Sequence, residues 1–143
     1  MFRLTFALEL FSSPDPAELA LSQESLNIML ECLVRINEAW LRAHPETPDL
    51  FDSGVYYQEE PPGQEDWCDI PTALKMRAID CEDIACWCVA ELRVRYGVPA
   101  QVYFTHQARK EGGDLYHILV WIPPNAQYPN GRTVDPSADL GMR

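Results

Sequence analysis

The sequence lacks any apolar run that approaches the roughly 18 residues of a membrane-spanning helix, so we expect no membrane span. Basic residues are also scarce: 11 Lys and Arg stand against 22 Asp and Glu, which gives a formal net charge of −11. Nucleic acids and anionic membranes need clustered Lys and Arg, so we expect neither as a partner. The N-terminus alternates apolar and polar residues without a small-residue cleavage site, which is unlike a signal peptide.

Paired cysteine spacing is missing too. The five cysteines form an odd set with no Cys-x-x-Cys motif and no disulfide-framework spacing; they are residues 32, 68, 81, 86 and 88. On a helix, Cys86 and Cys88 would point about 200° apart, so they do not form half of a metal site. We therefore expect free thiols, no cysteine metal site and a reducing, cytoplasmic location.

The composition is that of one packed domain, spanning residues 1–143. The chain is 47% apolar, which favours a globule over a disordered segment. A first strand is predicted within residues 2–11. Apolar residues then recur at three- and four-residue steps from Ala17 to about Arg42, which predicts a long amphipathic helix. This strand and helix make up an N-terminal extension over residues 1–50.

The rest of the chain, residues 54–142, predicts the core. The expected elements are a short strand at 54–58, a polar loop at 59–66, a short helix at 71–76, a long helix at 81–96, and strands at 98–107, 115–122 and 132–135. The helix that begins at Cys81 is apolar on opposite faces, so we expect burial on both sides. A central helix packed on an antiparallel sheet belongs to the α+β class.

Three residues in this core have the types and order that thiol catalysis needs. Cys81 begins the second long helix, His117 lies within a strand and Asp135 ends the next strand. A thiolate nucleophile needs a base that removes its proton and a third group that orients the base. The helix N-terminus would also lower the pKa of the Cys81 thiol. The order therefore predicts a Cys–His–Asp triad.

Each of these residues also has a structural explanation. Cys81 is compatible with a buried core cysteine, His117 with a hydrogen-bonded core histidine and Asp135 with a turn former. Carboxylates are costly around an inert cysteine, although Asp80 also suits a helix N-cap. His106, at the end of the preceding strand, is an alternative base.

The chain resembles the transglutaminase-like superfamily, and specifically the bacterial transglutaminase-like cysteine proteinases, over roughly residues 54–142. The similarity rests on Trp67-x-Asp69-Ile70-Pro71, Asp80-Cys81-Glu82-Asp83-Ile84-Ala85 and Ala90-Glu91-Leu92. It implies a papain-like core with Cys81 as nucleophile, His117 as base and Asp135 as its orienter. Ile79 departs from the family pattern, which has Gly there. Small proteins of this type also occur among phage-derived genes.

The resemblance implies a thiol acyl-transfer enzyme that hydrolyses an amide or peptide bond, or passes the acyl group to an amine. Its substrate would be a protein or peptide. The Cys81 backbone N–H is the expected oxyanion donor, and Trp67 is a pocket candidate that is better suited to packing. The alternative is a non-catalytic structural or assembly protein, such as a component of a phage-type particle, that binds an assembly partner.

Calcium is the one cofactor that the resemblance raises. In the periplasmic proteinase branch, acidic residues beside the cysteine bind calcium, and the matching residues are Asp80 and Glu82. Calcium prefers six to eight oxygen ligands, and neighbouring carboxylates on one helical turn cannot all face one ion. We therefore expect no tight metal site and no cofactor.

Overall fold

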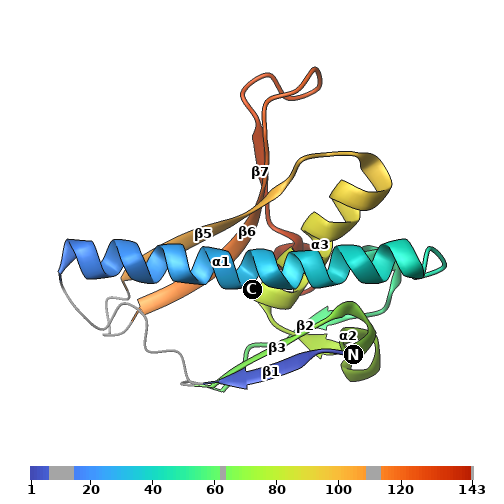
Figure 1. Ribbon diagram of the computed structural model, residues 1–143, viewed down its shortest axis with the longest axis horizontal. Helices are drawn as coiled ribbons and strands as arrows, with labels where there is room; N and C mark the ends of the chain where they lie inside the picture. The colour runs from blue at the N-terminus through green and yellow to red at the C-terminus, as the bar shows by residue number, and fades with distance from the viewer. Residues whose placement is uncertain (7–14, 62–63, 109–113, 143) are drawn as a thin grey trace.

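The computed structural model describes residues 1–6, 15–61, 64–108 and 114–142, and its helices and small sheets make the class α+β, as predicted. The helices are α1 (Pro16–Ala43), the 3-10 turn η1 (Leu50–Asp52), α2 (Ile70–Met76), α3 (Cys81–Tyr96) and α4 (Pro136–Asp139). The strands are β1 (Arg3–Phe6), β2 (Tyr56–Tyr57), β3 (Glu65–Cys68), β4 (Ala78–Ile79), β5 (Gln101–Ala108), β6 (Asp114–Ile122) and β7 (Arg132–Val134). Figure 1 shows their arrangement.

Helix α3 is the centre of the core. Asp80 caps its first turn, and Gly97, with a left-handed φ of 63°, ends it at the predicted residue. Ten of the eleven residues from Cys81 to Glu91 are buried, Glu82 being the exception. The predicted burial on both faces is therefore confirmed.

Helix α1 covers one side of α3. Asp15 caps it and Pro16 occupies its first turn, where a missing N–H costs nothing. Its inner face contributes Leu30, Leu33 and Val34 to the core, and it passes in front of α3 in Figure 1. Arg93 of α3 links the helices, since its guanidinium lies 2.7 Å from a Glu31 carboxylate oxygen.

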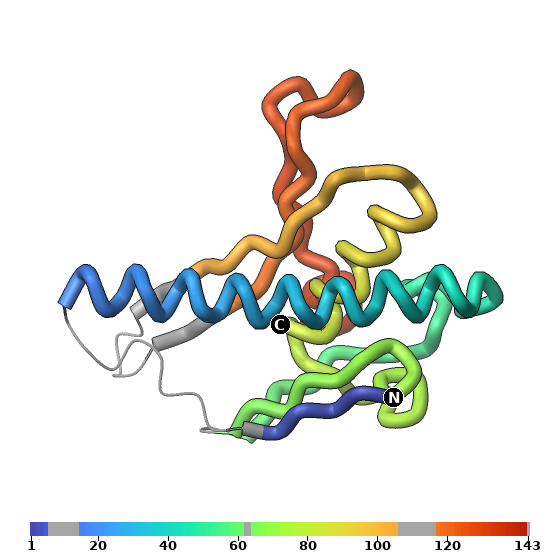
Figure 2. Tube along the Cα trace, in the orientation of Figure 1, coloured from blue at the N-terminus to red at the C-terminus, as the bar shows by residue number. Residues whose placement is uncertain are grey.

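The three-stranded sheet covers another side of α3. Strand β6 pairs antiparallel with β5 on one edge and with β7 on the other. Side chains alternate along β6, so that Ile118 and Val120 are buried in the core while His117 and Leu119 are only partly buried. The connection between β6 and β7 projects away from the rest of the molecule, as the tube in Figure 2 shows.

The short elements differ most from prediction. Strand β3 lies at the end of the expected 59–66 loop, where it pairs with β1 so that Leu4 opposes Trp67. Strand β4 and helix α4 were not predicted, and β5 begins at Gln101, three residues later than expected. Elements of two to four residues carry almost no periodicity, so their partners decide whether they form.

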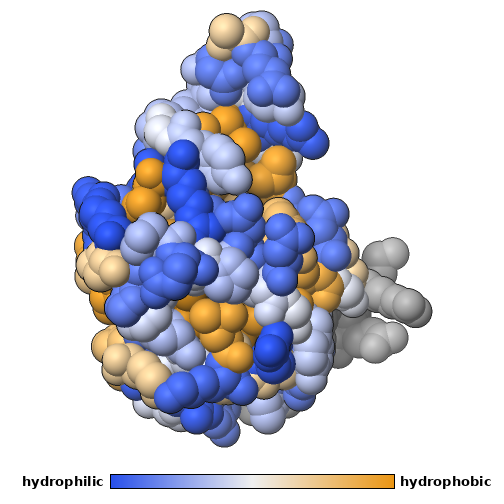
Figure 3. Space-filling model, turned by 90° about the vertical axis from the view of Figure 1, so that its right-hand side faces the viewer, coloured by the Kyte–Doolittle hydropathy of each residue, from blue (hydrophilic) through white to orange (hydrophobic). Residues whose placement is uncertain are grey.

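The surface has a mixed character. Figure 3 shows hydrophobic residues scattered among hydrophilic ones on the side viewed, without one continuous apolar area. Within the described ranges, no helix combines the length and hydropathy that crossing a bilayer requires.

One buried carboxylate connects the start of α3 to β3. The Cys68 backbone N–H donates to Asp83 Oδ1 at 2.8 Å, and its thiol lies 3.4 Å from Oδ2. Asp83 is 4% exposed. Burial raises the pKa of this carboxyl well above its usual range. The Cys68 N–H needs a hydrogen-bond acceptor at position 83, but this acceptor does not have to be charged.

We therefore predict different outcomes for two substitutions. Asp83→Ala leaves the Cys68 N–H unsatisfied and lowers the free energy of unfolding by about 1–3 kcal/mol. Asp83→Asn keeps an acceptor oxygen and cannot carry a charge, so the free energy of unfolding decreases less than with Asp83→Ala. Urea unfolding at pH 8 measures both, and equal losses would contradict the role of the acceptor.

Candidate active site

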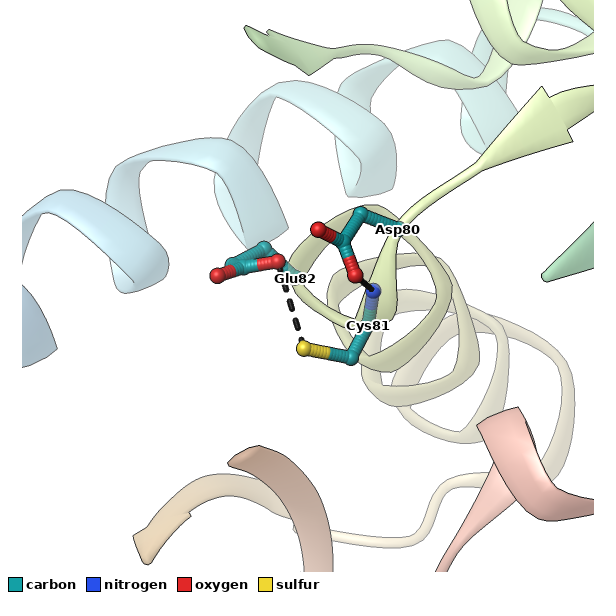
Figure 4. A group of neighbouring side chains, drawn as sticks. All are labelled: Asp80, Cys81 and Glu82. Atoms are coloured by element: carbon teal, nitrogen blue, oxygen red, sulfur yellow. Dashed lines mark hydrogen bonds between the residues drawn. The ribbon is translucent and has the colours of Figure 1, made fainter. Parts of the chain in front are cut away.

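Cys81 is the first residue of α3, and its thiol is 4% exposed. The sulfur lies 3.3 Å from Glu82 Oε2, and the Cys81 backbone N–H donates to the Asp80 carboxylate, as Figure 4 shows. The predicted nucleophile is therefore bonded to the carboxylates on both sides of it in the sequence, through its N–H and through its thiol.

These surroundings raise the pKa of the Cys81 thiol. Burial is the largest cause, followed by the charges of Glu82 and Asp80, while the Ile118 backbone N–H acts in the opposite direction. The expectation of an acidic thiol is therefore wrong. A helix N-terminus contributes only a partial positive charge, and here burial and two carboxylates outweigh it.

His117 and Asp135 form a hydrogen-bonded pair. His117 Nε2 lies 2.9 Å from Asp135 Oδ2, and the histidine side chain is 14% exposed. Asp135 Oδ1 also accepts the Ala138 N–H at 3.2 Å, which fixes the carboxylate at the start of α4. His117 Nδ1 is buried and has no hydrogen-bond partner among the described residues.

Cys81 lies beside the strand that carries His117, but the two are not bonded. Its thiol interacts with the backbone N–H of Ile118, the residue after His117 in β6. Within the described part of the chain, no hydrogen bond joins Cys81 to His117. The structure therefore brings His117 and Asp135 together, and leaves the thiol on Glu82.

A pocket of about 350 Å³ opens beside the histidine–aspartate pair. Its lining is formed by Thr105, His117, Leu119, Thr133, Val134, Asp135 and Met142. Cys81 is not among these residues, so the pocket is formed by the histidine–aspartate pair without the thiol.

Both predicted oxyanion donors are already engaged. The Cys81 N–H is bonded to Asp80. Trp67 is 3% exposed, and its Nε1–H donates to Glu65 Oε2 at 3.1 Å. Trp67 is therefore a packed side chain whose N–H holds a carboxylate at the edge of the site.

Asp80, Cys81 and Glu82 each place one metal-ligand atom within 4.8 Å of the others. Two carboxylates and a thiol do not suit calcium, which takes oxygen ligands only. Burial, and in Glu82 also the charges of Asp80 and Glu65, raise the pKa of both carboxyls. The set fits protonated carboxyls better than calcium.

Sequence reasoning missed the direct partner of the thiol. The sequence marks Glu82 as one of the acidic residues beside Cys81 and, by resemblance, as a calcium candidate, but it does not show that the Glu82 carboxylate lies 3.3 Å from the sulfur. The lining residue Met142 had no sequence signal, because it depends on where the chain runs after α4. The side chain of the alternative base, His106, lies outside the described residues.

Three comparisons with known proteins gave no match. No family model, no curated protein and no solved structure matches the chain. The resemblance to transglutaminase-like proteins therefore rests on the sequence segments given above, and the function has to be argued from the geometry.

Carboxylates also crowd the surface next to Asp80. Both oxygens of Glu60 accept the Asp66 backbone N–H, at 2.9 and 3.1 Å. Burial, then the charges of Asp80, Glu65 and Asp66, raise the pKa of Glu60 to about 7. Glu60 lines a pocket of about 320 Å³ together with Glu59 and Asp83.

This shift predicts a pH dependence of stability. A carboxyl whose pKa is higher in the folded than in the unfolded state stabilises the fold at low pH, and this contribution is lost as pH rises toward the folded pKa. Glu60→Gln should therefore remove part of the decrease in unfolding free energy between pH 4.5 and about 7. Urea unfolding across this range tests it, with Glu59→Gln, an exposed neighbour, as control. A Glu60→Gln curve parallel to the wild-type curve would contradict the prediction.

Proposed function

We propose that the protein is a thiol acyl-transfer enzyme of transglutaminase-like type with a papain-like core. Cys81 is the nucleophile, His117 the base and Asp135 the residue that orients it. The substrate is an amide or peptide bond of a protein or peptide in the cytoplasm. The acyl group passes to water or to an amine.

The His117–Asp135 hydrogen bond carries this proposal. Because Nε2 is bonded to Asp135, the ring presents Nδ1 to its other side. Nδ1 is buried and without a partner among the described residues, which is unfavourable for a histidine that serves packing only. The thiol lies beside the next residue of the same strand. A thiol that rotated toward Nδ1 would complete the triad.

The reaction follows from these positions. The Cys81 thiol transfers its proton to His117 Nδ1, and the sulfur attacks the carbonyl carbon, so that a C–S bond forms. The imidazolium then protonates the departing amine as the C–N bond breaks. Asp135 stabilises the imidazolium between the two steps. Attack by water or an amine on the thioester releases the acyl group and restores the thiol.

Two contacts must change before this reaction proceeds. The thiol has to exchange Glu82 for His117. Asp80 has to release the Cys81 N–H if this group is to stabilise the oxyanion. The raised pKa values of Glu82 and Asp80 favour these two changes respectively, since a neutral carboxyl is a weaker acceptor than a carboxylate.

The alternative is a non-catalytic assembly protein that keeps the fold. The thiol's bond to Glu82 and its raised pKa favour this alternative, because both oppose thiolate formation. In that case His117 and Asp135 would serve only to attach the start of α4 to β6.

Trapping of the acyl-enzyme distinguishes the two functions. With p-nitrophenyl acetate, we expect an acetyl group on Cys81, located by mass spectrometry, and its removal by water or an added amine. His117→Ala should slow acylation at least tenfold, and Asp135→Asn should slow it less. The control is Cys32→Ser, which removes the one exposed cysteine and should change nothing at Cys81. Acylation of Cys81 that is unaffected by His117→Ala would contradict the proposal.

Cys81→Ser provides a separate test. If Cys81 serves turnover, acyl transfer disappears while the free energy of unfolding changes by about 1 kcal/mol or less, because the substitution is nearly isosteric and Glu82 accepts from the new hydroxyl. If Cys81 is only a packing residue, the change in stability is equally small, because Glu82 still accepts from the hydroxyl, but the wild type shows no acyl transfer to lose. Thermal and urea melts measure the change in stability, and absence of acyl transfer in a folded wild type would favour the assembly protein.

A further inference from the structure

The outer face of α1 has the residues of a helix-pairing surface. Its inner face is committed to the core, whereas the opposite side carries Leu21 and Ile28, which are 64% and 58% exposed. Cys32 and Ala39 are exposed on the same side. These residues follow one another at steps of seven, four and seven, which keeps them in one line along a helix. We call this line the outer stripe of α1.

Nothing among the described residues covers the outer stripe. In Figure 1, α1 passes in front of α3 and of one end of the β5–β6 pair, and no other described element lies in front of it. Leu21 and Ile28 are two of the most exposed large apolar side chains in the chain. From Leu21 to Ala39 the outer stripe forms a narrow seam about 27 Å long on this helix.

The charged residues beside the outer stripe change from acidic to basic along the helix. Along one flank, Glu24 and Glu31 come first, and Arg35 and Arg42 follow. The Arg35 side chain is 68% exposed, although its guanidinium also lies 3.2 Å from Glu31. In a parallel pair of such helices, like charges would face each other. In an antiparallel pair, Glu24 of each helix lies beside Arg35 of the other.

We infer that the outer stripe of α1 binds a second copy of this chain, with the two α1 helices antiparallel about a twofold axis near residue 30. In this register Ile28 faces Cys32 of the other copy, and Leu21 faces Ala39. The same register overlaps the helices along their whole length, because residue 30 is the middle of Pro16–Ala43. Large side chains then oppose small ones, so the helices approach closely.

This interface is independent of the proposed acyl transfer. A stable interface needs about 1,000 Å² or more of buried surface. Two narrow helical seams supply the low end of that range, so the dimer should be in exchange with monomer at micromolar concentrations. Sedimentation velocity of the wild type between 1 and 200 µM tests this: a rise toward the mass of two chains is expected, and a monomer at every concentration would overturn the inference.

Disulfide formation tests the register. Ile28→Cys should place two new thiols opposite Cys32 of the other copy, and mild oxidation should convert most of the protein to a covalent dimer. The remaining four cysteines are buried and do not compete. The matched control is Leu21→Cys, which faces Ala39 and should cross-link at least tenfold less. If the wild type or Leu21→Cys cross-links as efficiently as Ile28→Cys, the antiparallel register is wrong.

A charged side chain tests the seam itself. Ile28→Glu should raise the dissociation constant of the dimer at least tenfold while leaving the thermal melt of the monomer unchanged, because position 28 lies outside the core. Glu24→Lys should weaken the dimer several-fold by facing Arg35, an effect that added salt reduces. A dissociation constant unchanged by Ile28→Glu would overturn the inference.

Discussion

The burial of α3 on nearly all sides is the constraint on which the other elements depend. A helix that buries ten of its first eleven residues must be covered by several partners at once. Here α1 covers one side, the β5–β6 pair another, and β3 and α4 lie beside its first turns. Helix α1 of the N-terminal extension is therefore part of the core, because it supplies Leu30, Leu33 and Val34.

The same burial creates the electrostatic problem at the start of α3. Asp80, Glu82 and Asp83 lie where a helix N-terminus favours negative charge, yet all three have raised pKa values because the site is buried. Each carboxyl has a specific donor: Asp80 the Cys81 N–H, Glu82 the Cys81 thiol and Asp83 the Cys68 N–H. Hydrogen bonds thus partly offset the loss of hydration.

Long periodic elements were predictable from the sequence, and short ones were not. The 3.6-residue period predicted α1 and α3 to within a residue or two, and caps mark their limits: Asp15 caps the start of α1 and Gly97 the end of α3. Strands β5 and β6 were found for the same reason, with β5 starting late because Val98 and Pro99 follow the helix cap. By contrast, β3 has four residues and exists through pairing with β1, more than 60 residues away in the chain.

The site was predictable in its residue types but not in its electrostatics. Sequence order predicted His117 within a strand and Asp135 at the end of the next. The strand in fact ends at Val134 and Asp135 caps α4, and the 2.9 Å contact with His117 follows from β6 pairing with β7. The order of these residues does not predict in which direction the Cys81 thiol points. That direction depends on burial of Cys81 and on the adjacent Glu82, which only three-dimensional packing determines.

The two candidate functions differ in the partner of the Cys81 thiol: Glu82 in the assembly protein and His117 in the enzyme. A thiol bonded to a carboxylate stays protonated, and a thiol bonded to an imidazole can form an ion pair that is reactive at neutral pH. The sulfur lies 3.3 Å from Glu82 Oε2 and close to the backbone of Ile118, the residue after His117 in β6. The proposed enzyme therefore requires the sulfur to exchange Glu82 for His117, whereas the assembly protein would keep the contact with Glu82.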